Sequence, residues 1–564
     1  MNALNAAFAI LMIYWLFIAI LDRRGVLERY NITAFGPILM IRTRRGQSLL
    51  SVLARPRGFW KILADVGIPA MLIGMFVMFL LVIMTDYAML QSIFDRTMPP
   101  PGKYNAPQNI FLIPGVNEYI PLVWGAIGLA ITLVVHELGH AVLCRVEGVD
   151  VKSMGLLTLI VPIGGFAEPD EEQLFGKKIS DHSDVEYTKA TSGYDRAVRD
   201  VQTKSPIREG GVPRRSRMRI LAAGVMVNFV AAAIIFLLLF GPVLGAIAPV
   251  SNVMIASVKE NSAAAQAGIK DEMVITQVDN TTIQTAHDFY AYMTTRSHGK
   301  PLTVHVQERQ TRKVFILEAD DMVLQSGVAI WEVLEDSAAS RANLTEDMII
   351  TQIDDTPIYN STDFIAFLNT TVPGQTVEMF FAEDNATFVE LGSSPDRSCG
   401  YLGVVATTNL EFAGMSIGAY PAAETLHILQ KIPAMMRGIE GWLIVFALPF
   451  IGFDGTGFTG FSNTMQFYEP VGWAAGYGVL VFWIANALLW TFWINFFAGL
   501  FNCLPAVPLD GGHVFRDTIR LLTERMIGDR DAERLSQIMA AAFALLIFGS
   551  FAFMIFGPYI VYGL

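Results

Sequence analysis

Six apolar stretches are long enough to cross a membrane, and they constrain the fold of this chain more than any other feature. The hydrocarbon core of a bilayer is about 30 Å thick, which an α-helix of about 20 apolar residues can span. Stretches of this kind lie at 4–21, 66–85, 121–145, 218–246, 471–501 and 535–562. Charged residues make up 16% of the chain, whereas soluble domains contain about 25%. The sequence therefore predicts a polytopic α-helical membrane protein with about six transmembrane helices.

The distribution of lysine and arginine predicts how the spans are oriented. Basic residues concentrate between the first and second spans, the third and fourth, and the fifth and sixth, and loops rich in them stay in the cytoplasm. Both termini and the long segment between the fourth and fifth spans should then be extracytoplasmic. Five Asn-x-Ser/Thr sequons agree by lying in that segment, at Asn280, Asn343, Asn360, Asn369 and Asn385, although Asn31 lies in an expected cytoplasmic loop. We expect an integral protein of a prokaryotic cell membrane, and the net charge of −12 argues against nucleic acid as a partner.

The long segment between the fourth and fifth spans contains an internal repeat. SAAAQAGIKDEMVITQVDNTTI, from Ser262, aligns without gaps on SAASRANLTEDMIITQIDDTPI, from Ser337. VITQVD and IITQID predict strands, and the segments that follow predict helices. The pattern resembles PDZ domains, so we expect a tandem of small α+β PDZ-like extracytoplasmic domains at 249–322 and 323–405, although neither copy shows a clear Gly-Leu-Gly-Phe loop. Such domains bind peptide C-termini along a sheet edge; alternatively, the pair only spaces or shields the membrane core.

The third span ends in an ionisable motif, VVHELGHAV at 134–142. His136 and His140 are spaced i, i+4, so on a helix they face the same way and can bind one zinc ion. Glu137 projects beside them, where it can take a proton from water without being a ligand. A satisfied pair of helical histidines is the alternative, but unpaired imidazole and carboxylate groups are costly within a membrane. The motif therefore predicts a catalytic zinc site whose third protein ligand must come from elsewhere in the chain.

Two residues are candidates for the third ligand. Cys144 lies one turn further along the same face, but three successive turns of one straight helix cannot easily converge on one metal, and a small buried apolar role suits it better. Asp510, in FNCLPAVPLDGGHVF, is a lone carboxylate at the end of an apolar stretch whose backbone is broken by proline and glycine. Irregular backbone at membrane depth survives only where protein or an aqueous cavity satisfies its polar groups. The expected topology brings Asp510 to the same cytoplasmic side as the histidines.

With these motifs in place, the sequence resembles the site-2 protease family of intramembrane zinc metalloproteases. The resemblance rests on HELGH at 136–140 and on the N-x-x-P-x-x-x-L-D-G-G-H pattern that begins at Asn502, in the order HExxH span, span, PDZ-like pair, LDG span. It implies one Zn²⁺ per chain bound by His136, His140 and Asp510. It also implies that Glu137 is the general base and acid, and that Asn502 holds the substrate backbone.

The resemblance extends to two further regions. Gly224 and Asn228 match the family's Gly-x-x-x-Asn helix motif, although the usual Gly-Pro is Gly-Val here, and ordinary helix packing is the alternative role. Residues 151–166 occupy the place of a membrane-dipping β-hairpin that offers an edge to substrate. Gly164 and Gly165 suit the tight turn or kink that such a hairpin needs.

The resemblance implies hydrolysis of peptide bonds in or near transmembrane segments of single-span proteins, including ones already shortened by an earlier cut outside. A helix hides its amides in its own hydrogen bonds, so the substrate must unwind and pair with the hairpin as a strand. The expected organisation is two N-terminal spans with a basic loop (1–119), a first part of the catalytic core (120–248), the PDZ-like pair and a second part of the core (406–564). Residues 450–463, rich in Gly and Phe, form either a gate or re-entrant loop or a lipid-facing turn.

Three other functional classes fit the sequence less well. A non-proteolytic membrane protein that binds or transports zinc has no need of Glu137 and tends to carry polar positions across successive spans. An aspartyl intramembrane protease requires a GxGD motif, which the chain lacks. A rhomboid-like serine protease requires a Ser–His pair in the membrane, and HELGH accounts better for the histidines.

Overall fold

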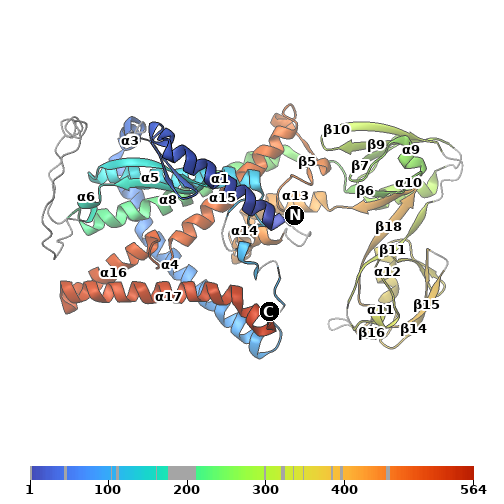
Figure 1. Cartoon of the computed structure of the whole chain (residues 1–564). Coiled ribbons are helices and arrows are strands. Elements are labelled where there is room, and N and C mark those ends of the chain that lie inside the picture. Colours follow the sequence, from blue (N-terminus) through green and yellow to red (C-terminus); the bar gives the residue numbers. More distant parts are fainter. Residues whose placement is uncertain are drawn as a thin grey trace. The chain divides into compact units, whose positions relative to one another are not determined.

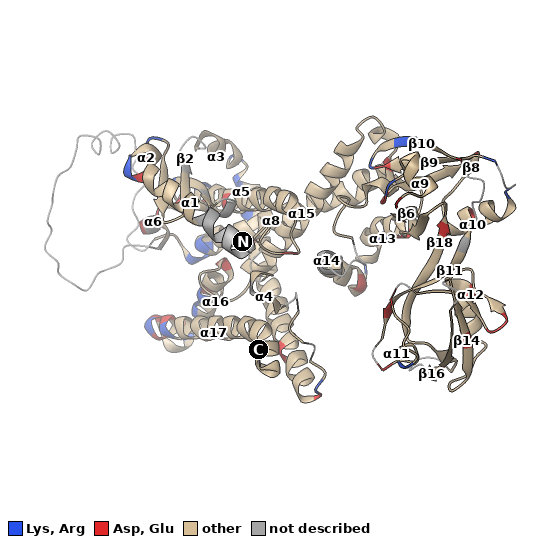
Figure 2. Ribbon diagram, turned by 45° about the vertical axis from the view of Figure 1, so that its right-hand side comes forward, with Lys and Arg blue, Asp and Glu red and all other residues tan. Residues whose placement is uncertain are grey.

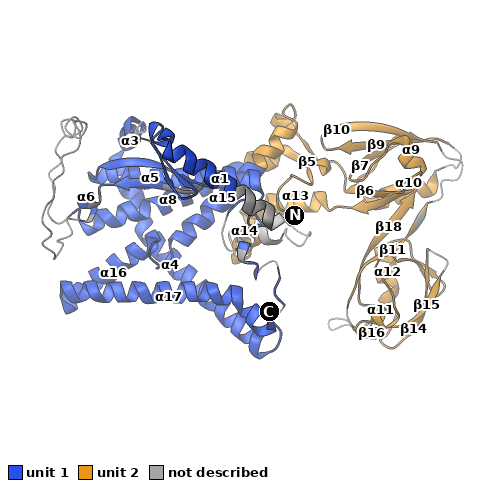
Figure 3. Cartoon of the chain, viewed as in Figure 1, with its two compact units in different colours: residues 1–239, 486–564 blue, residues 240–485 orange. Residues whose placement is uncertain are grey.

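The computed structural model describes residues 3–563 except 44–46, 99, 103–104, 110–112, 160–161, 176–210, 297–299, 319–323, 335, 347, 383–384, 394–397 and 452–457. The chain forms two compact units (Figure 3). Unit 1 comprises residues 1–239 and 486–564, and unit 2 comprises residues 240–485.

Unit 1 consists mainly of long helices (Figure 1). They are α1 Ala3–Arg23, α4 Arg57–Phe94, α5 Leu122–Glu147, α8 Arg214–Leu238, the greater part of α15 Val479–Asn502, α16 Asp510–Ile527 and α17 Asp529–Tyr562. The shorter helices are α2 Val26–Arg29, α3 Gln47–Leu53, η2 Pro107–Asn109 and α6 Glu171–Phe175.

The part of the chain that the structure describes contains five helical segments that are long and apolar enough to span a membrane: Arg57–Phe94, Leu122–Glu147, Arg214–Ala246, Val479–Asn502 and Asp529–Tyr562. They coincide with the second to sixth expected spans. The first expected span coincides with α1, which is not among the five. A polytopic membrane protein is therefore confirmed, whereas the expected number of six spans is not.

Small residues let the helices of unit 1 approach closely. An ideal Cβ on Gly139 of α5 would lie 2.9 Å from the carbonyl oxygen of Ala223 on α8. A Cβ on Gly128, also on α5, would lie 3.1 Å from the backbone of Thr491 on α15. Small residues are enriched at such crossings because helices in lipid associate through packing rather than through the hydrophobic effect.

Ion pairs tie α8 to the helices around it. The guanidinium of Arg219 bonds to Asp65 on α4 at 2.6 Å and to Glu147 on α5 at 3.1 Å. Arg217 makes a two-bond contact with Asp517 on α16, at 2.6 and 2.7 Å, and both side chains are largely buried. Charged residues also gather where α16 meets α17 (Figure 2). These contacts fix the relative positions of the helices that carry the histidines and Asp510.

A small antiparallel sheet completes unit 1. Its strands, in sheet order, are β1 Ile32–Phe35, β2 Ile38–Thr43, β3 Val151–Thr158 and β4 Pro162–Pro169. The expected hairpin at 151–166 is confirmed by the pairing of β3 with β4, whereas β1 and β2 were not expected. Gly164 and Gly165 lie inside β4, opposite Leu157 and Leu156, rather than at the turn. In the described residues β4 is an edge strand.

Unit 2 contains one long sheet with the strand order β10-β9-β7-β6-β19-β18-β11-β12-β14-β15. Its strands and those paired at its sides are β6 Val253–Val258, β7 Val274–Val278, β8 Thr281–Thr282, β9 Leu302–Glu308, β10 Thr311–Leu317, β11 Gln325–Val333, β12 Ile349–Ile353, β13 Thr356–Pro357, β14 Thr376–Phe381, β15 Ala386–Glu390, β18 Val404–Phe412 and β19 Met415–Ala419. Its helices are α9 Ala263–Ala267, α10 Ala286–Thr295, α11 Ala338–Arg341 and α12 Ser361–Leu368. The remaining elements are η3 Leu239–Val243, η4 Leu244–Ala246, β5 Ile247–Pro249, β16 Gly392–Ser393, β17 Gly400–Tyr401, α13 Ala422–Met435, α14 Ile439–Ile451, η6 Met465–Phe467, β20 Tyr468–Pro470 and η7 Gly472–Ala474.

The sheet has two halves with the same order of elements. The first half runs from β6 to β10 and the second from β11 to β15, each as strand, short helix, strand, short strand, helix, strand, strand. The strands expected at VITQVD and IITQID are β7 and β12, and the expected helices that follow are α10 and α12. Ser262 and Ser337 cap the short helices by accepting the same hydrogen bond from a backbone N–H three residues on. Each half has its own apolar core, and the assignment of both to PDZ domains stays a prediction.

The chain completes the halves in a nested order. After β15 it forms β18, which pairs with β11 of the second half, and then β19, which pairs with β6 of the first. In both halves a glycine with positive φ precedes the completing strand, Gly403 at +77° and Gly414 at +81°. A Cβ on either would lie 2.3 or 2.2 Å from the Cβ of the capping serine. The boundary expected after residue 405 falls inside β18, because residues beyond it return to the sheet.

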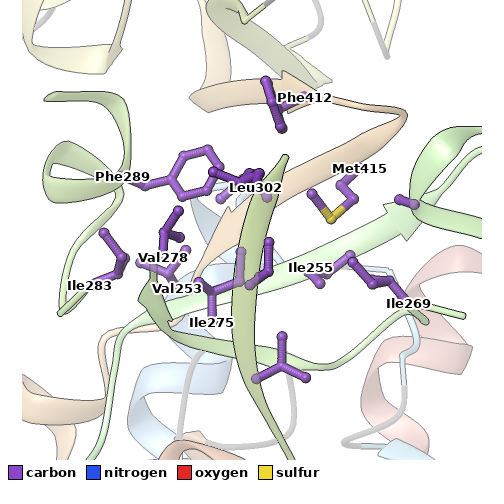
Figure 4. Close-up of a cluster of buried hydrophobic side chains, with 14 of the residues drawn as sticks. Val253, Ile255, Ile269, Ile275, Val278, Ile283, Phe289, Leu302, Phe412 and Met415 are labelled. Atoms are coloured by element: carbon purple, nitrogen blue, oxygen red, sulfur yellow. The ribbon is translucent and has the colours of Figure 1, made fainter. Parts of the chain in front are cut away.

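The outer edges of the two completing strands differ. The edge of β19 that faces away from β6 is already paired, since Met415, Ser416 and Ile417 lie opposite the end of β18. Two side chains from that end, Leu410 and Phe412, are buried in the core of the first half, with the Phe412 ring edge-on to Phe289 at 6.4 Å (Figure 4). By contrast, residues 404–409 of β18 pair only with β11 in the described part of the chain.

The segment at 450–463 lies only partly within the described residues. Helix α14 ends at Ile451, and residues 452–457 are outside the description. Phe458 and Phe461, which follow, are buried and in edge-on ring contact at 4.8 Å. The gate expected here therefore stays a prediction.

Candidate metal centre

Helix α5 supplies three of the predicted site residues. Because one helical turn separates His136 from His140, their rings meet edge to face with centroids 4.7 Å apart. Their side chains are only 13% and 14% exposed. Glu137 lies on the same turn, and its carboxylate contacts Ala167 of β4.

Asp510 reaches the histidines because the chain turns back sharply between α15 and α16. Two glycines that follow it allow the turn: a Cβ on Gly511 would lie 2.4 Å from the carbonyl oxygen of Cys503, and one on Gly512 would lie 2.5 Å from the backbone of Ala506. No larger residue fits such close backbone contacts. The Asp-Gly-Gly sequence thus explains how a carboxylate can stand at the first residue of α16.

The three ligand atoms predicted from the sequence form a nearly equilateral triangle. His136 Nε2 and His140 Nε2 are 3.1 Å apart, and each is 3.2 Å from Asp510 Oδ2. Among the described residues this is the group whose His, Asp, Glu or Cys atoms can meet on one metal ion. A tetrahedral zinc ion with bonds of about 2.0–2.2 Å holds its ligands about 3.3 Å apart, so the triangle has the size that zinc requires.

The protonation of the triangle also fits a cation. His140 Nδ1 lies 2.8 Å from the carbonyl oxygen of Ile220, and a carbonyl only accepts, so the proton of that ring is on Nδ1 and its Nε2 carries a lone pair. That lone pair faces a carboxylate oxygen, Asp510 Oδ2, which is buried without a hydrogen-bond partner of its own. Converging lone pairs repel unless a positive charge lies among them. The residues present therefore fit Zn²⁺ bound by His136, His140 and Asp510.

Helix α8 provides the surroundings of both histidines. Gly224 leaves room for the rings, because a Cβ there would lie 2.4 Å from His140 Nε2 and 2.8 Å from His136 Cε1. One turn on, the amide of Asn228 lies 3.1 Å from His136 Nδ1. The structure thus places Gly224 and Asn228 at the site, where the sequence had left open a role in ordinary helix packing.

Glu137 contacts the edge strand of the small sheet rather than Asp510 or the two imidazoles. Its Oε2 accepts a hydrogen bond of 2.6 Å from the backbone N–H of Ala167 on β4. Backbone groups of a strand alternate in direction, so Gly165 directs its N–H and C=O to the same side as Ala167, away from β3. Gly164 directs its groups toward β3. Of the two glycines predicted to bind substrate, only Gly165 therefore offers free backbone groups beside Glu137.

The other candidates lie as follows. Asn502 is the last residue of α15, and its Nδ2 donates to the carbonyl oxygen of Ala498 in the same helix, at 3.0 Å. Cys144 is 1% exposed within an apolar cluster and does not belong to the metal group of the described residues. It is the small buried residue that the sequence favoured over a ligand.

Sequence reasoning missed Ala167 and Ile220 because both act through the backbone. A backbone N–H or C=O leaves no mark in the identity of its residue. The buried pair of Arg217 and Asp517 was also missed, because Arg217 was interpreted only as one of the basic residues that set topology. The available signal was Asp517, a carboxylate two helical turns after Asp510 and on the same helix.

Comparison with known proteins agrees with this geometry. The model of peptidase family M50 matches residues 124–547. An uncharacterized protein of Methanocaldococcus jannaschii is 32% identical over 158 residues, which cover 28% of this chain and 40% of that protein. A protein of Agrobacterium fabrum named as a candidate zinc metalloprotease is 29% identical over 197 residues, covering 32% of this chain and 48% of that protein. The matches thus span less than half the length of either relative.

Proposed function

Because the chain belongs to peptidase family M50, the site-2 protease family, we propose that it is a zinc metalloprotease that cuts peptide bonds in or near the transmembrane segments of single-span membrane proteins. The observation that carries the proposal is the triangle of His136, His140 and Asp510. The two histidines lie on α5, which is long and apolar enough to span a membrane, and Asp510 follows α15, which is another such helix. A peptide bond reaches such a site only from within or beside the membrane.

The chemistry divides between the metal and Glu137. A zinc ion bound by the three ligands lowers the pKa of water toward 7 and polarises a carbonyl group. Glu137 takes a proton from the attacking water and passes it to the leaving amine, which is general base and then general acid catalysis. Its position next to the ligands, without being one of them, supports this role.

The edge of β4 offers the substrate a binding surface. A transmembrane helix must unwind before its amides can be attacked, and the exposed amides then need new partners. The outward N–H and C=O of Gly165 and the C=O of Ala167 can pair with such a strand. Since Ala167 also holds Glu137, a strand bound here would lie directly beside the general base. Asn502 is proposed to hold the substrate backbone.

Unit 2 is proposed to act as a docking site or size filter for substrates, including ones already cut outside the membrane. The two halves offer different edges to a peptide C-terminus. In the first half, the end of β18 already occupies the edge of β19. In β18, Leu410 and Phe412 face β19, and backbone groups alternate in direction along a strand. The N–H and C=O of Ala406 therefore point to the same side, where the described residues of the second half have no further strand. Peptide binding is therefore expected in the second half.

A binding assay tests this assignment with the purified full chain. A peptide that ends in a free carboxylate should bind, and the same peptide with an amidated end should not, because the carboxylate needs backbone N–H donors. Ala406→Pro, which removes an N–H on the open edge, should weaken binding. Unchanged binding by the proline variant would contradict docking at this edge.

The topology expected from the basic loops belongs to the same proposal. The active site is placed toward the cytoplasmic side, and unit 2 and both termini are placed outside the cell membrane. Labelling of single cysteines by a membrane-impermeant reagent in intact cells tests this arrangement.

Cleavage of a single-span substrate by the purified, zinc-loaded chain tests the enzymatic proposal. Glu137→Gln should retain zinc and lower the rate by about a hundred- to ten-thousandfold, the range that general acid–base catalysis contributes. Glu172→Gln, an exposed glutamate on α6, is the matched control. If Glu137→Gln retains zinc and forms product at the wild-type rate, the proposed role of Glu137 as general base would be ruled out. Zinc binding without cleavage by the wild type would favour the alternative of a zinc-binding or transport protein.

A further inference from the structure

Three positions of α8, each one turn apart, surround the two histidines. The carbonyl oxygen of Ile220 accepts from His140 Nδ1 at 2.8 Å. Gly224 provides the space that both rings occupy. The amide of Asn228 meets His136 Nδ1 at 3.1 Å. One face of α8 therefore contacts the nitrogen of each ring that points away from Asp510.

The two contacts have opposite consequences as the atoms stand. The Ile220 carbonyl keeps a proton on His140 Nδ1, so the Nε2 of that ring is free to bind a metal. At His136 the Asn228 NH₂ group faces Nδ1, which makes Nδ1 the acceptor and leaves the proton on Nε2. An imidazole with a proton on Nε2 cannot bind a metal through that atom.

The other atom of the same amide points to the resolution. Asn228 Oδ1 is buried without a hydrogen-bond partner, in a side chain that is 0% exposed. Burial does not choose between the two orientations of the amide, because a half-turn puts its NH₂ group where the oxygen was; the choice depends on what His136 needs to bind a metal. A half-turn of the amide about its last side-chain bond places this oxygen against His136 Nδ1. The oxygen then accepts from Nδ1–H, and Nε2 of His136 carries the lone pair that the metal needs.

We propose that Asn228 is a positioning residue for the metal centre: its amide oxygen accepts from His136 Nδ1–H and thereby holds His136 in the tautomer that binds zinc. The inference rests on the proposed zinc site and adds a residue that is not a ligand. Partners of this kind orient metal-binding histidines, and their loss lowers metal affinity about ten- to a hundredfold.

The polarity and position of Asn228 favour this role over simple packing. Nothing in the described residues bonds to its Oδ1, and an apolar side chain of similar size would fill the space between α5 and α8 without burying an amide. The match to Ile220 is also specific. Ile220 contacts Nδ1 of His140 and Asn228 contacts Nδ1 of His136. Each histidine of α5 therefore has its own partner on α8 at the same ring atom.

Metal binding by the purified full chain in detergent tests the proposal, with competition between the protein and a chelator for Zn²⁺ as the readout. Asn228→Leu should lower zinc affinity about ten- to a hundredfold. Asn228→Asp, whose carboxylate can accept from Nδ1–H, should stay within a few-fold of the wild type. Asn495→Leu is the matched control, because Asn495 on α15 is also 0% exposed and its Oδ1 also lacks a partner.

The visible spectrum of the Co²⁺-loaded protein supplies a second readout that does not depend on activity. Asn228→Leu should change the bands or intensity of the ligand-field absorption, and Asn228→Asp and Asn495→Leu should keep the wild-type spectrum. Wild-type zinc affinity in Asn228→Leu, or an equal loss in Asn228→Leu and Asn228→Asp, would overturn the proposal. If Asn228→Leu does not fold, the aspartate variant still decides, since a packing role predicts that a buried charge weakens the site. A wild-type chain that binds no zinc would instead refute the proposed function.

Discussion

The two units of the chain depend on different kinds of residue. In unit 1, the ligand atoms of three polar side chains converge to form the proposed metal centre, and a few glycines and ion pairs hold the helices around it. In unit 2, two apolar cores hold the halves of the sheet together, and its described residues contain no comparable metal group. A single change should therefore affect chemistry in unit 1 and stability in unit 2.

The halves of unit 2 extend this comparison within one sheet. They share an order of elements and a serine cap, yet the chain fills the edge of one and leaves the other unpaired. Similar sequences thus acquire different surfaces through residues outside the repeated stretch. The first half is supported by Leu410 and Phe412, which come from the strand that completes the second.

The largest effect is expected from Asp510→Ala. The substitution leaves two protein ligands on the metal, so zinc affinity should fall by more than the hundredfold that loss of an outer partner can cost, and cleavage should reach background. Zinc content and competition with a chelator measure this. Asp355→Ala, an exposed residue of unit 2, should change neither. If Asp510→Ala retains zinc at the wild-type affinity, the claim that changes in unit 1 affect chemistry and changes in unit 2 affect stability would be wrong.

Phe289→Ala tests the other side of the comparison. Phe289 is 0% exposed in the core of the first half, against Phe412. Removal of a buried phenylalanine costs about 3–5 kcal/mol, so unit 2 should unfold or be proteolysed at a clearly lower temperature while zinc affinity stays unchanged. Phe388→Ala, at an exposed position of β15, should have little effect. A parallel loss of zinc would show that the metal site depends on this core.

Much of the metal centre could be predicted from the sequence, because its residues are rare in their surroundings. His136, His140 and Asp510 are ionisable groups in apolar segments, where few roles other than metal binding or catalysis tolerate them. The repeated strands and helices of unit 2 were equally clear, since alternating valine and isoleucine persist through both copies. In each case a local pattern was enough.

The rest depended on contacts that no local pattern records. Strands β18 and β19 lie outside the repeated stretch, and their pairing with β11 and β6 joins segments distant in sequence. Ala167 and Ile220 act through backbone atoms, so their identities carry no signal. Gly164 and Gly165 were expected at a tight turn or a kink. They lie inside β4, beside a shift in its register with β3, and glycine also suits a strand whose free edge must admit another backbone.

Gly224→Ala should have an intermediate effect confined to the metal centre. The added Cβ would lie 2.4 Å from His140 Nε2, so the ring or α8 must move. Zinc affinity should fall about tenfold or more, in the range set by misplaced ligand partners, while the helices of unit 1 keep their thermal stability to within about 1 kcal/mol. Gly549→Ala on α17, where a Cβ meets nothing within 4 Å, is the control. Equal effects of the two substitutions on zinc would contradict a local cause.

The smallest effect concerns acid stability of the first half of unit 2. Burial alone would raise the pKa of Asp288, but hydrogen bonds from Thr285 and from the backbone of Gln284 outweigh burial and hold that pKa below its ordinary value. The lowered pKa stabilises the folded state above about pH 4, the ordinary value for aspartate, and the benefit is lost as the pH falls through the folded pKa. Asp288→Asn, which alters the capping box of α10, should therefore cost about 1 kcal/mol at pH 7 and less in acid. Thermal unfolding at several pH values measures the difference, with Asp271→Asn as an exposed control. If the loss of stability caused by Asp288→Asn does not shrink in acid, the effect comes from packing rather than from the carboxylate charge. That result would strengthen the claim that unit 2 depends more on its apolar cores than on its charges.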